Sequence, residues 1–273
     1  MLLLALAVLF GLYAAPVLAQ THYACENPGY LAHFDDRLGP QSCDTIATAT
    51  VHWRGGTAQI RAIRPHDTPI GDSAGYVRMI NDVATRVGAA MDQMGGPLAL
   101  DTVTIVFTNY VSPRESGTDW VMNKGAYTAG ASRTFAHECP VSYYKERVPH
   151  GYDNAVFTLS HELFHCIQYR TWPGMPDQGW LVEATAEYFA YLAKPDFGAG
   201  FIPQFDQNIR DTGIDQMSYP DVVFYLWLGD AYGPSRVREL IAASRGIEGS
   251  ITPDMMGEFA KAYYDRRIHI PGG

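Results

Sequence analysis

The residues best suited to chemistry form a short motif, His161-Glu162-x-x-His165. On a helix, positions i and i+4 share one face, so the two imidazoles can bind one metal ion. With one further ligand and an open position, a zinc ion lowers the pKa of a bound water toward neutrality. Glu162 lies beside the histidines, where its carboxylate can accept the proton of that water. The motif therefore predicts zinc ligands at His161 and His165 and a general base at Glu162.

A second segment supplies a candidate for the third ligand. Glu183 belongs to the sequence Trp180-Leu-Val-Glu183-Ala-Thr-Ala-Glu187, and a Pro/Gly turn separates it from His165. That turn can fold two helices antiparallel, so the Glu183 carboxylate can reach an ion held by the histidines. Asp177 and Asp215 are the alternative ligands, but neither lies in an equally suitable helical context.

These two segments resemble the gluzincin metallopeptidases, the group that contains thermolysin and aminopeptidase N, over residues 153–193. The resemblance implies three zinc ligands, His161, His165 and Glu183. It implies that Glu162 is the general base and that Glu187 accepts a hydrogen bond from the first histidine, which fixes the tautomer of that ring. The implied reaction is hydrolysis of a peptide bond by a zinc-activated water, with a peptide or protein as substrate.

A third segment, Ser218-Tyr219-Pro-Asp-Val222, resembles the Ser-Tyr-x-x-Gly sequence of the aminopeptidase-N branch, although Asp-Val replaces the Lys-Gly of that branch. The resemblance implies that Tyr219 donates a hydrogen bond to the oxyanion formed during hydrolysis. Tyr225 and His150 are the alternative donors. The chain lacks the Gly-x-Met-Glu-Asn sequence with which aminopeptidases hold a free amine, so endopeptidase action is favoured.

The residues leave two alternative functions open and exclude two others. One alternative is a structural exported domain in which the motif occurs by chance. A zinc-binding recognition or adhesion module of zincin fold, which does not cleave peptides, would carry the same motif. A metzincin is excluded, because that family needs Gly and His at the positions of Gln168 and Thr171. A nucleic-acid partner is excluded, because 29 acidic residues outnumber 20 basic ones, for a formal net charge of −9, and the basic residues form no cluster.

The elements that must position these residues are predicted from hydrophobic periodicity. Strands are expected at residues 48–53, 58–63, 102–107 and 140–144. Helices are expected at residues 74–94, 153–169, 180–193, 220–229, 234–244 and 253–267. Asp153 is expected to cap the motif helix, and the last helix is expected to follow Thr252. The order of strands first and helices second predicts an α+β fold.

The resemblance to gluzincins further implies that the α+β fold has a zincin-like architecture. It implies a small mixed sheet with an edge strand over the motif helix, followed by a mostly helical C-terminal half. In gluzincins the peptide substrate usually adds to the sheet edge as a further strand. The candidates for that edge are Gly125–Ser132 and Pro140–Tyr144.

The chain of 273 residues divides into three expected parts. Residues 1–19 are predicted to be a cleaved signal peptide, with an uncleaved membrane anchor as the alternative. Residues 20–70 are predicted to be a small disulfide-stapled β module or the edge of a sheet. Residues 71–273 are predicted to be the metallopeptidase domain. No stable membrane insertion is expected after signal cleavage.

The four cysteines agree with export. An even number of cysteines in an exported chain predicts disulfides. Proximity in the sequence favours the pairs Cys25–Cys43 and Cys139–Cys166. The chain also has no Asn-x-Ser/Thr glycosylation site. The expected location is therefore secreted or periplasmic.

Overall fold

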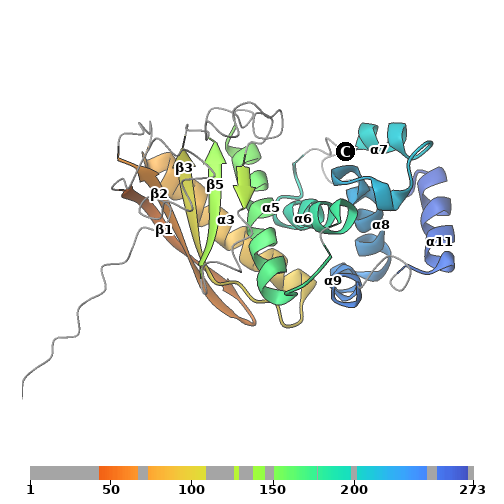
Figure 1. Ribbon diagram of the computed structural model, residues 1–273, viewed down its shortest axis with the longest axis horizontal. Helices are drawn as coiled ribbons and strands as arrows, with labels where there is room; N and C mark the ends of the chain where they lie inside the picture. The colour runs from red at the N-terminus through yellow and green to blue at the C-terminus, as the bar shows by residue number, and fades with distance from the viewer. Residues whose placement is uncertain are drawn as a thin grey trace, which may run out of the picture.

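A five-stranded mixed sheet forms one side of the molecule, and helices form the rest (Figure 1). The computed structural model describes residues 43–66, 73–108, 126–128, 138–144, 151–176, 178–197, 202–244 and 251–269. The strands are β1 Cys43–Trp53, β2 Gly56–Pro65, β3 Thr102–Thr108, β4 Ala126–Thr128 and β5 Glu138–Tyr144. Their order across the sheet is β1-β2-β3-β5-β4. The central pairs β2–β3 and β3–β5 are parallel, whereas β1 and β4 pair antiparallel with their neighbours.

The hairpin β1–β2 is an edge of this sheet. Ile60 lies in parallel register with Val103, so β2 pairs directly with β3. The strands expected between residues 20 and 70 are therefore the sheet edge, and the boundary drawn at residue 70 does not separate them from the rest of the sheet. Residues 1–42, with the predicted signal peptide, lie outside the described residues.

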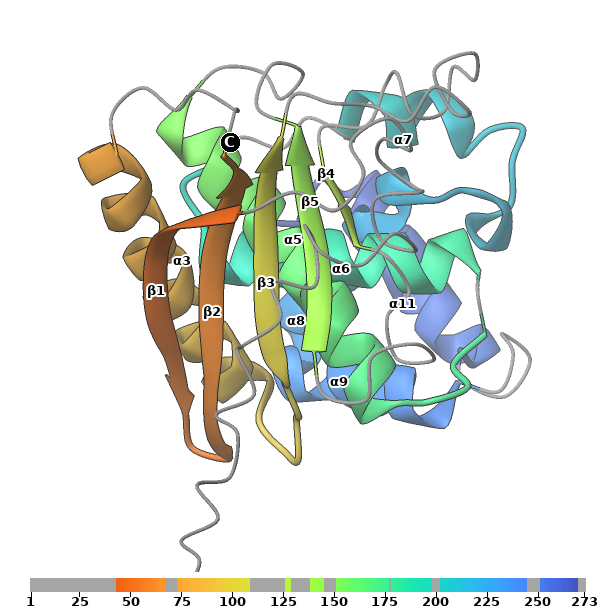
Figure 2. The ribbon, with the colours of Figure 1, turned by 60° about the vertical axis from the view of Figure 1, so that its left-hand side comes forward.

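One face of the sheet is covered by two long helices (Figure 2). Helix α3, Ser73–Met94, packs against β1, and α5, Tyr152–Thr171, packs against β4 and β5. The buried residues of α3 recur at helical spacing, among them Ile80, Val83 and Val87. Removing such side chains from water contributes about 1.5–3 kcal/mol each. Burial of this apolar stripe fixes α3 on the sheet.

The motif helix α5 continues into α6, Gly179–Ala193, through a short Pro/Gly turn. The two helices pack against each other through Phe164 and Phe189, whose rings stack with centroids 4.5 Å apart. The expected cap of α5 was wrong. Gly151 is the N-cap, and Asp153 lies within the first turn, where it pairs with Lys194 Nζ at 3.2 Å. The Asp153 carboxylate therefore forms an ion pair at the end of α6 and does not cap α5.

The C-terminal half is helical, as expected. Its elements are α7 Ile202–Asn208, η3 Ile214–Gln216, η4 Tyr219–Asp221, α8 Val222–Tyr232, α9 Pro234–Ala243 and α11 Pro253–Tyr264. Thr252 caps α11 by accepting a hydrogen bond from the Met255 backbone N–H at 3.2 Å, which confirms the predicted start of that helix. The chain is therefore a mixed α/β protein with a small mixed sheet, compatible with the predicted α+β class.

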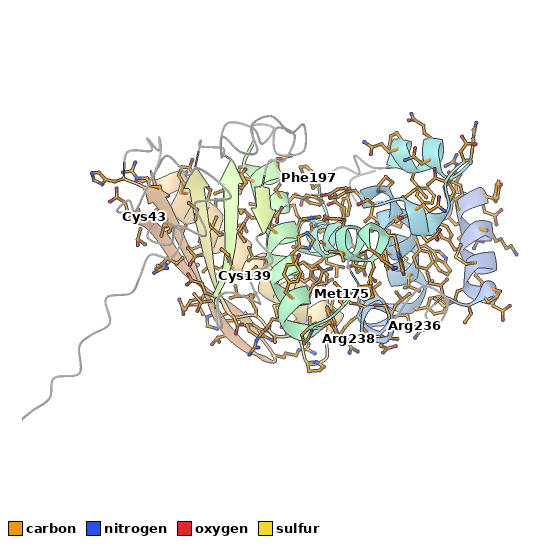
Figure 3. The ribbon with its side chains drawn as sticks, viewed as in Figure 1. Cys43, Cys139, Met175, Phe197, Arg236 and Arg238 are labelled. Atoms are coloured by element: carbon orange, nitrogen blue, oxygen red, sulfur yellow. A yellow bond between two sulfur atoms is a disulfide. The ribbon has the colours of Figure 1, made fainter. Side chains whose placement is uncertain are left out.

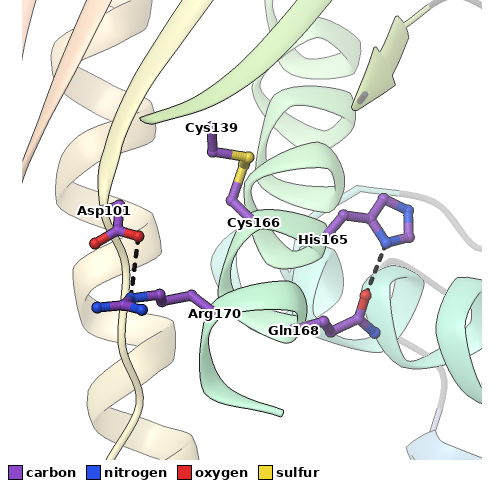
Figure 4. The surroundings of a disulfide bond; sticks show 6 residues. All are labelled: Asp101, Cys139, His165, Cys166, Gln168 and Arg170. Carbon is purple, nitrogen blue, oxygen red and sulfur yellow. Dashed lines mark hydrogen bonds and ion pairs between the residues drawn. A yellow bond between two sulfur atoms is a disulfide. The ribbon is translucent and has the colours of Figure 1, made fainter. Parts of the chain in front are cut away.

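A disulfide ties the sheet to the motif helix. Cys139 of β5 and Cys166 of α5 are bonded, as predicted. Figure 4 shows that Cys166 points toward β5, whereas His165 points to another side of α5. Cys43, at the outer part of the sheet in Figure 3, is also disulfide-bonded, and Cys25 lies outside the described residues. None of the described helices combines the length and apolar content that a membrane span needs.

Candidate metal centre

Helix α5 presents both motif histidines on the face that packs against α6. His161 Nε2 and His165 Nε2 lie 3.1 Å apart. Each residue is only 6% exposed, so water does little to solvate the two nitrogens. The i, i+4 spacing brings the rings to one point, as the sequence predicted. Their burial follows from the packing of α6 over this face of α5.

Glu183 of α6 completes a cluster of three metal-ligand atoms. Its Oε2 lies 3.3 Å from His161 Nε2 and 3.4 Å from His165 Nε2. Ligands about 2.0–2.1 Å from a common zinc ion lie about 3.3 Å apart in a tetrahedral site. The three separations therefore fit one face of such a site. In the described part of the chain, these three residues are the one set of His, Cys, Asp or Glu side chains that could hold a metal.

A further residue behind each histidine determines where its proton lies. Glu187 Oε2 lies 2.9 Å from His161 Nδ1. Gln168 Oε1 lies 2.7 Å from His165 Nδ1, as Figure 4 shows. Both oxygens accept hydrogen bonds, so both Nδ1 atoms carry hydrogen. In the neutral rings, each Nε2 then holds a lone pair. Two lone pairs and a carboxylate that face one another need a positive charge between them.

The pKa values of the cluster agree with a positive charge at its centre. Burial disfavours the charged form of His161, but hydrogen bonds to Glu183 and Glu187 outweigh burial and raise the pKa of His161 to about 10. Burial acts against the charged carboxylate of Glu183 too, yet the two histidines hold the pKa of Glu183 well below its usual range. A proton on His161 therefore supplies the central charge when no metal is bound, and a divalent cation would replace it.

Tyr219 of η4 lies beside the cluster. Its ring stacks on that of His161 with centroids 5.7 Å apart, and its phenol is hydrogen-bonded to Glu183. Burial and the charge of Glu183 raise the pKa of this phenol far above its ordinary value. The hydroxyl therefore stays protonated and can donate a hydrogen bond at neutral pH.

Glu162 is also part of the site. It is 7% exposed, and its negative charge raises the pKa values of both His161 and Tyr219. It directly follows His161 in α5. The structure thus brings together the predicted residues His161, His165, Glu183, Glu187 and Tyr219, and the charge of Glu162 acts on two of them.

The alternatives from the sequence lie elsewhere or outside the described residues. Asp215 is on η3 and outside the cluster that could hold a metal, and its charge acts on Asp221. Tyr225 is fully buried on α8, and its hydroxyl has no hydrogen-bond partner among the described residues. Asp177 and His150 lie outside the described residues.

Sequence analysis missed one residue of the centre, Gln168. In the sequence, this residue only argues against a metzincin. The available signal was its position three residues after His165, because i and i+3 share a helix face.

No protein-family model matches the chain, and a search of the curated proteins returns no match. The function proposed below is therefore argued from the residues of the site.

Proposed function

We propose that the protein is an exported zinc-dependent peptidase of zincin-like fold that acts on internal peptide bonds. The observation that carries this proposal is the convergence of His161, His165 and Glu183, whose ligand atoms lie 3.1–3.4 Å apart. Imidazole and carboxylate ligands in a tetrahedral spacing suit zinc. Three protein ligands leave a fourth position open, which is typical of a catalytic zinc rather than a structural one.

The residues around the cluster have the chemistry that hydrolysis requires. A zinc ion bound there would acidify a water molecule and polarise the carbonyl of the substrate. Glu162 accepts the proton of the attacking water and passes it to the leaving nitrogen. Glu187 holds the His161 ring in the tautomer that binds a metal.

Tyr219 is proposed to stabilise the negative charge that develops on the carbonyl oxygen. Its phenol remains protonated and is hydrogen-bonded to Glu183. That bond keeps the hydroxyl within reach of the ligand cluster. A donor at this place would stabilise the charge that develops on the carbonyl oxygen in the transition state.

The arrangement of the sheet supports binding of an extended peptide. β4 pairs antiparallel with β5 and is the last strand in the order of the described sheet. It also contacts the motif helix α5. An extended substrate would pair with β4 on the side away from β5, on the part of the sheet that contacts the motif helix. Residues 126–128 belong to the Gly125–Ser132 segment that was a candidate for this edge.

Export is proposed from the disulfides and from the apolar start of the sequence. Cys139–Cys166 and the bond of Cys43 would be reduced in a cytosol that keeps thiols free. A secreted or periplasmic location provides the oxidising conditions that both bonds need.

The proposal is tested by offering a mixed peptide library to the zinc-loaded protein and to the Glu162→Gln variant. We expect the wild-type protein to cleave, and the cut positions to be internal. The variant should bind zinc in the same stoichiometry, because Glu162 is not a ligand, and should lose most of the cleavage, because its amide cannot accept the proton.

Two outcomes would contradict the proposal. Full cleavage by Glu162→Gln would remove Glu162 from the mechanism. Zinc binding without cleavage by the wild-type protein would favour a zinc-binding recognition or adhesion module.

A further inference from the structure

We propose that Gln168 is the positioning residue that sets the metal-binding state of His165 and locks the two ligand helices together. The inference rests on the metal centre proposed above and names a residue that this centre needs in addition to its ligands. Gln168 is fully buried on α5, and its amide makes three hydrogen bonds. It would not touch the substrate or the metal.

The orientation of the Gln168 amide is fixed by its neighbours. Its Nε2 donates to the Val182 carbonyl at 2.9 Å and to Thr185 Oγ1 at 2.8 Å. The reversed amide would place Oε1 against the Val182 carbonyl, and two acceptors would then face each other. Oε1 therefore has to face His165 Nδ1, which it meets at 2.7 Å.

This orientation selects one tautomer of His165. An amide oxygen can only accept, so Nδ1 of the ring must carry the hydrogen. Nε2 is then free of hydrogen and can bind a metal. Without Gln168, the neutral ring would also populate the tautomer with hydrogen on Nε2, which blocks binding.

The same amide also positions Glu183. Its two acceptors, Val182 and Thr185, lie on either side of Glu183 in the sequence of α6. Thr185 Oγ1 itself donates to the Leu181 carbonyl, so it presents a lone pair to Gln168. One side chain on α5 therefore orients the second ligand and fixes the segment of α6 that carries the third.

The charge of the centre explains why a neutral residue is suitable here. Glu162, Glu183 and Glu187 already bring three negative charges to the centre. Together they more than balance a divalent cation. A carboxylate in place of Gln168 would add a fourth negative charge at a fully buried position, which is costly.

The test compares the wild-type protein with Gln168→Met, a substitution of similar size without polar hydrogen-bonding groups. Zinc affinity is measured by competition with a chromophoric chelator. Two-bond ¹H–¹⁵N NMR correlations report the His165 tautomer in the metal-free protein. We expect hydrogen on Nδ1 of His165 in the wild type, a mixture of tautomers in the variant, and zinc binding weakened by about 10–100-fold.

Thr185→Val is the matched control, because it removes one hydrogen bond of the Gln168 amide but leaves the bond to His165. It should keep the wild-type tautomer and a zinc affinity within about threefold. A purely structural role for Gln168 predicts weaker zinc binding in Gln168→Met without any change in the His165 tautomer, and this result would overturn the proposal.

The remaining outcomes separate this inference from the proposed function. Hydrogen on Nε2 of His165 in the wild type would refute the role of Gln168 even if Gln168→Met did not fold. Equal zinc affinity in the wild type and Gln168→Met would refute it as well, while leaving the zinc site in place. A wild-type protein that binds no zinc would overturn both proposals.

Discussion

Tyr219 illustrates how a single hydroxyl can be assigned a role by its neighbours. The ring is stacked on His161 and the phenol is bonded to Glu183, yet phenol is a poor zinc ligand beside imidazole and carboxylate. Its place at the edge of the cluster suits a donor to the substrate better than a ligand. The distinction can be measured, because a donor affects turnover and a ligand affects metal content.

We expect Tyr219→Phe to lower kcat by about 10²–10³-fold with little change in KM, because the lost hydrogen bond acts on the transition state. The zinc content should stay that of the wild type. Tyr225→Phe removes the hydroxyl of the rival tyrosine and is expected to retain nearly all activity. The assignment would be wrong if steady-state kinetics showed the larger loss in Tyr225→Phe.

Asp221, two residues after Tyr219, is a buried carboxyl group outside the proposed mechanism. It is fully buried, and no described residue makes a hydrogen bond to either of its oxygens. Burial, aided by the charge of Asp215, raises the pKa of Asp221 from 3.8 to about 8. The group is therefore protonated in the folded protein at pH values where the unfolded chain has lost the proton.

The sign of the pH dependence follows from this difference. Between about pH 4 and pH 8 the folded state binds one proton more than the unfolded state, so the Asp221 contribution to stability falls as the pH rises, by up to about 1.4 kcal/mol per pH unit. Asp221→Asn should remove this contribution. Urea unfolding of the metal-free protein at pH 5 and pH 8 measures it, with the exposed Asp254→Asn as control. An unchanged pH dependence in Asp221→Asn would contradict the prediction.

At the scale of elements, the position of α3 on the sheet depends on a glycine. A Cβ at Gly88 would lie 2.2 Å from the backbone oxygen of His52 on β1. Backbone atoms cannot move aside as a flexible side chain can, so the helix would have to shift. The close contact of α3 and β1 is possible only without a side chain at this position.

Gly88→Ala is therefore expected to destabilise the protein by about 1–3 kcal/mol, although alanine has the higher helix propensity. Gly257→Ala is the matched control, because it also lies in a helix, α11, and a Cβ there meets no atom of the described structure within 4 Å. It should be neutral or stabilising by up to about 1 kcal/mol. Denaturant unfolding measures the stability of both variants. The prediction would be wrong if Gly88→Ala were the more stable of the two.

Across the whole molecule, α5 and α6 lie between the sheet and the C-terminal helices (Figure 1). α5 contacts β4 and β5, and α6 contacts α8 and η4. A metal held between α5 and α6 would thus connect elements from both sides of the molecule. Its binding free energy would then contribute to the stability of the entire fold.

We expect zinc at about 100 times its dissociation constant to stabilise the protein by about 2.7 kcal/mol, which corresponds to a rise in Tm of about 5–10 °C. Excess chelator should reverse the rise. Glu183→Ala should show little response to zinc, since it lacks one ligand. Calorimetry that found the same zinc-dependent rise in this variant would point to a different third ligand.

The fold could be predicted from the sequence where hydrophobic periodicity is long. The helix expected at 74–94 is Ser73–Met94, and the strand expected at 102–107 is Thr102–Thr108. Short helices and strands show too little hydrophobic periodicity to be predicted in the same way. The three-residue strand β4 lay within a segment named only as a candidate edge, and α7 was missed, because its seven residues are too few to show a period.

The sequence by itself determined that His161 and His165 share a face and that Glu162 lies beside them, because a helix is built from hydrogen bonds between residues four apart. Only the tertiary structure decided that Glu183, Tyr219 and Gln168 meet at those rings. Their convergence depends on the turn after α5, on the packing of Phe164 against Phe189 and on amide contacts between helices. Packing of this kind joins residues that are distant in the sequence, so the spacing of neighbouring residues cannot predict it.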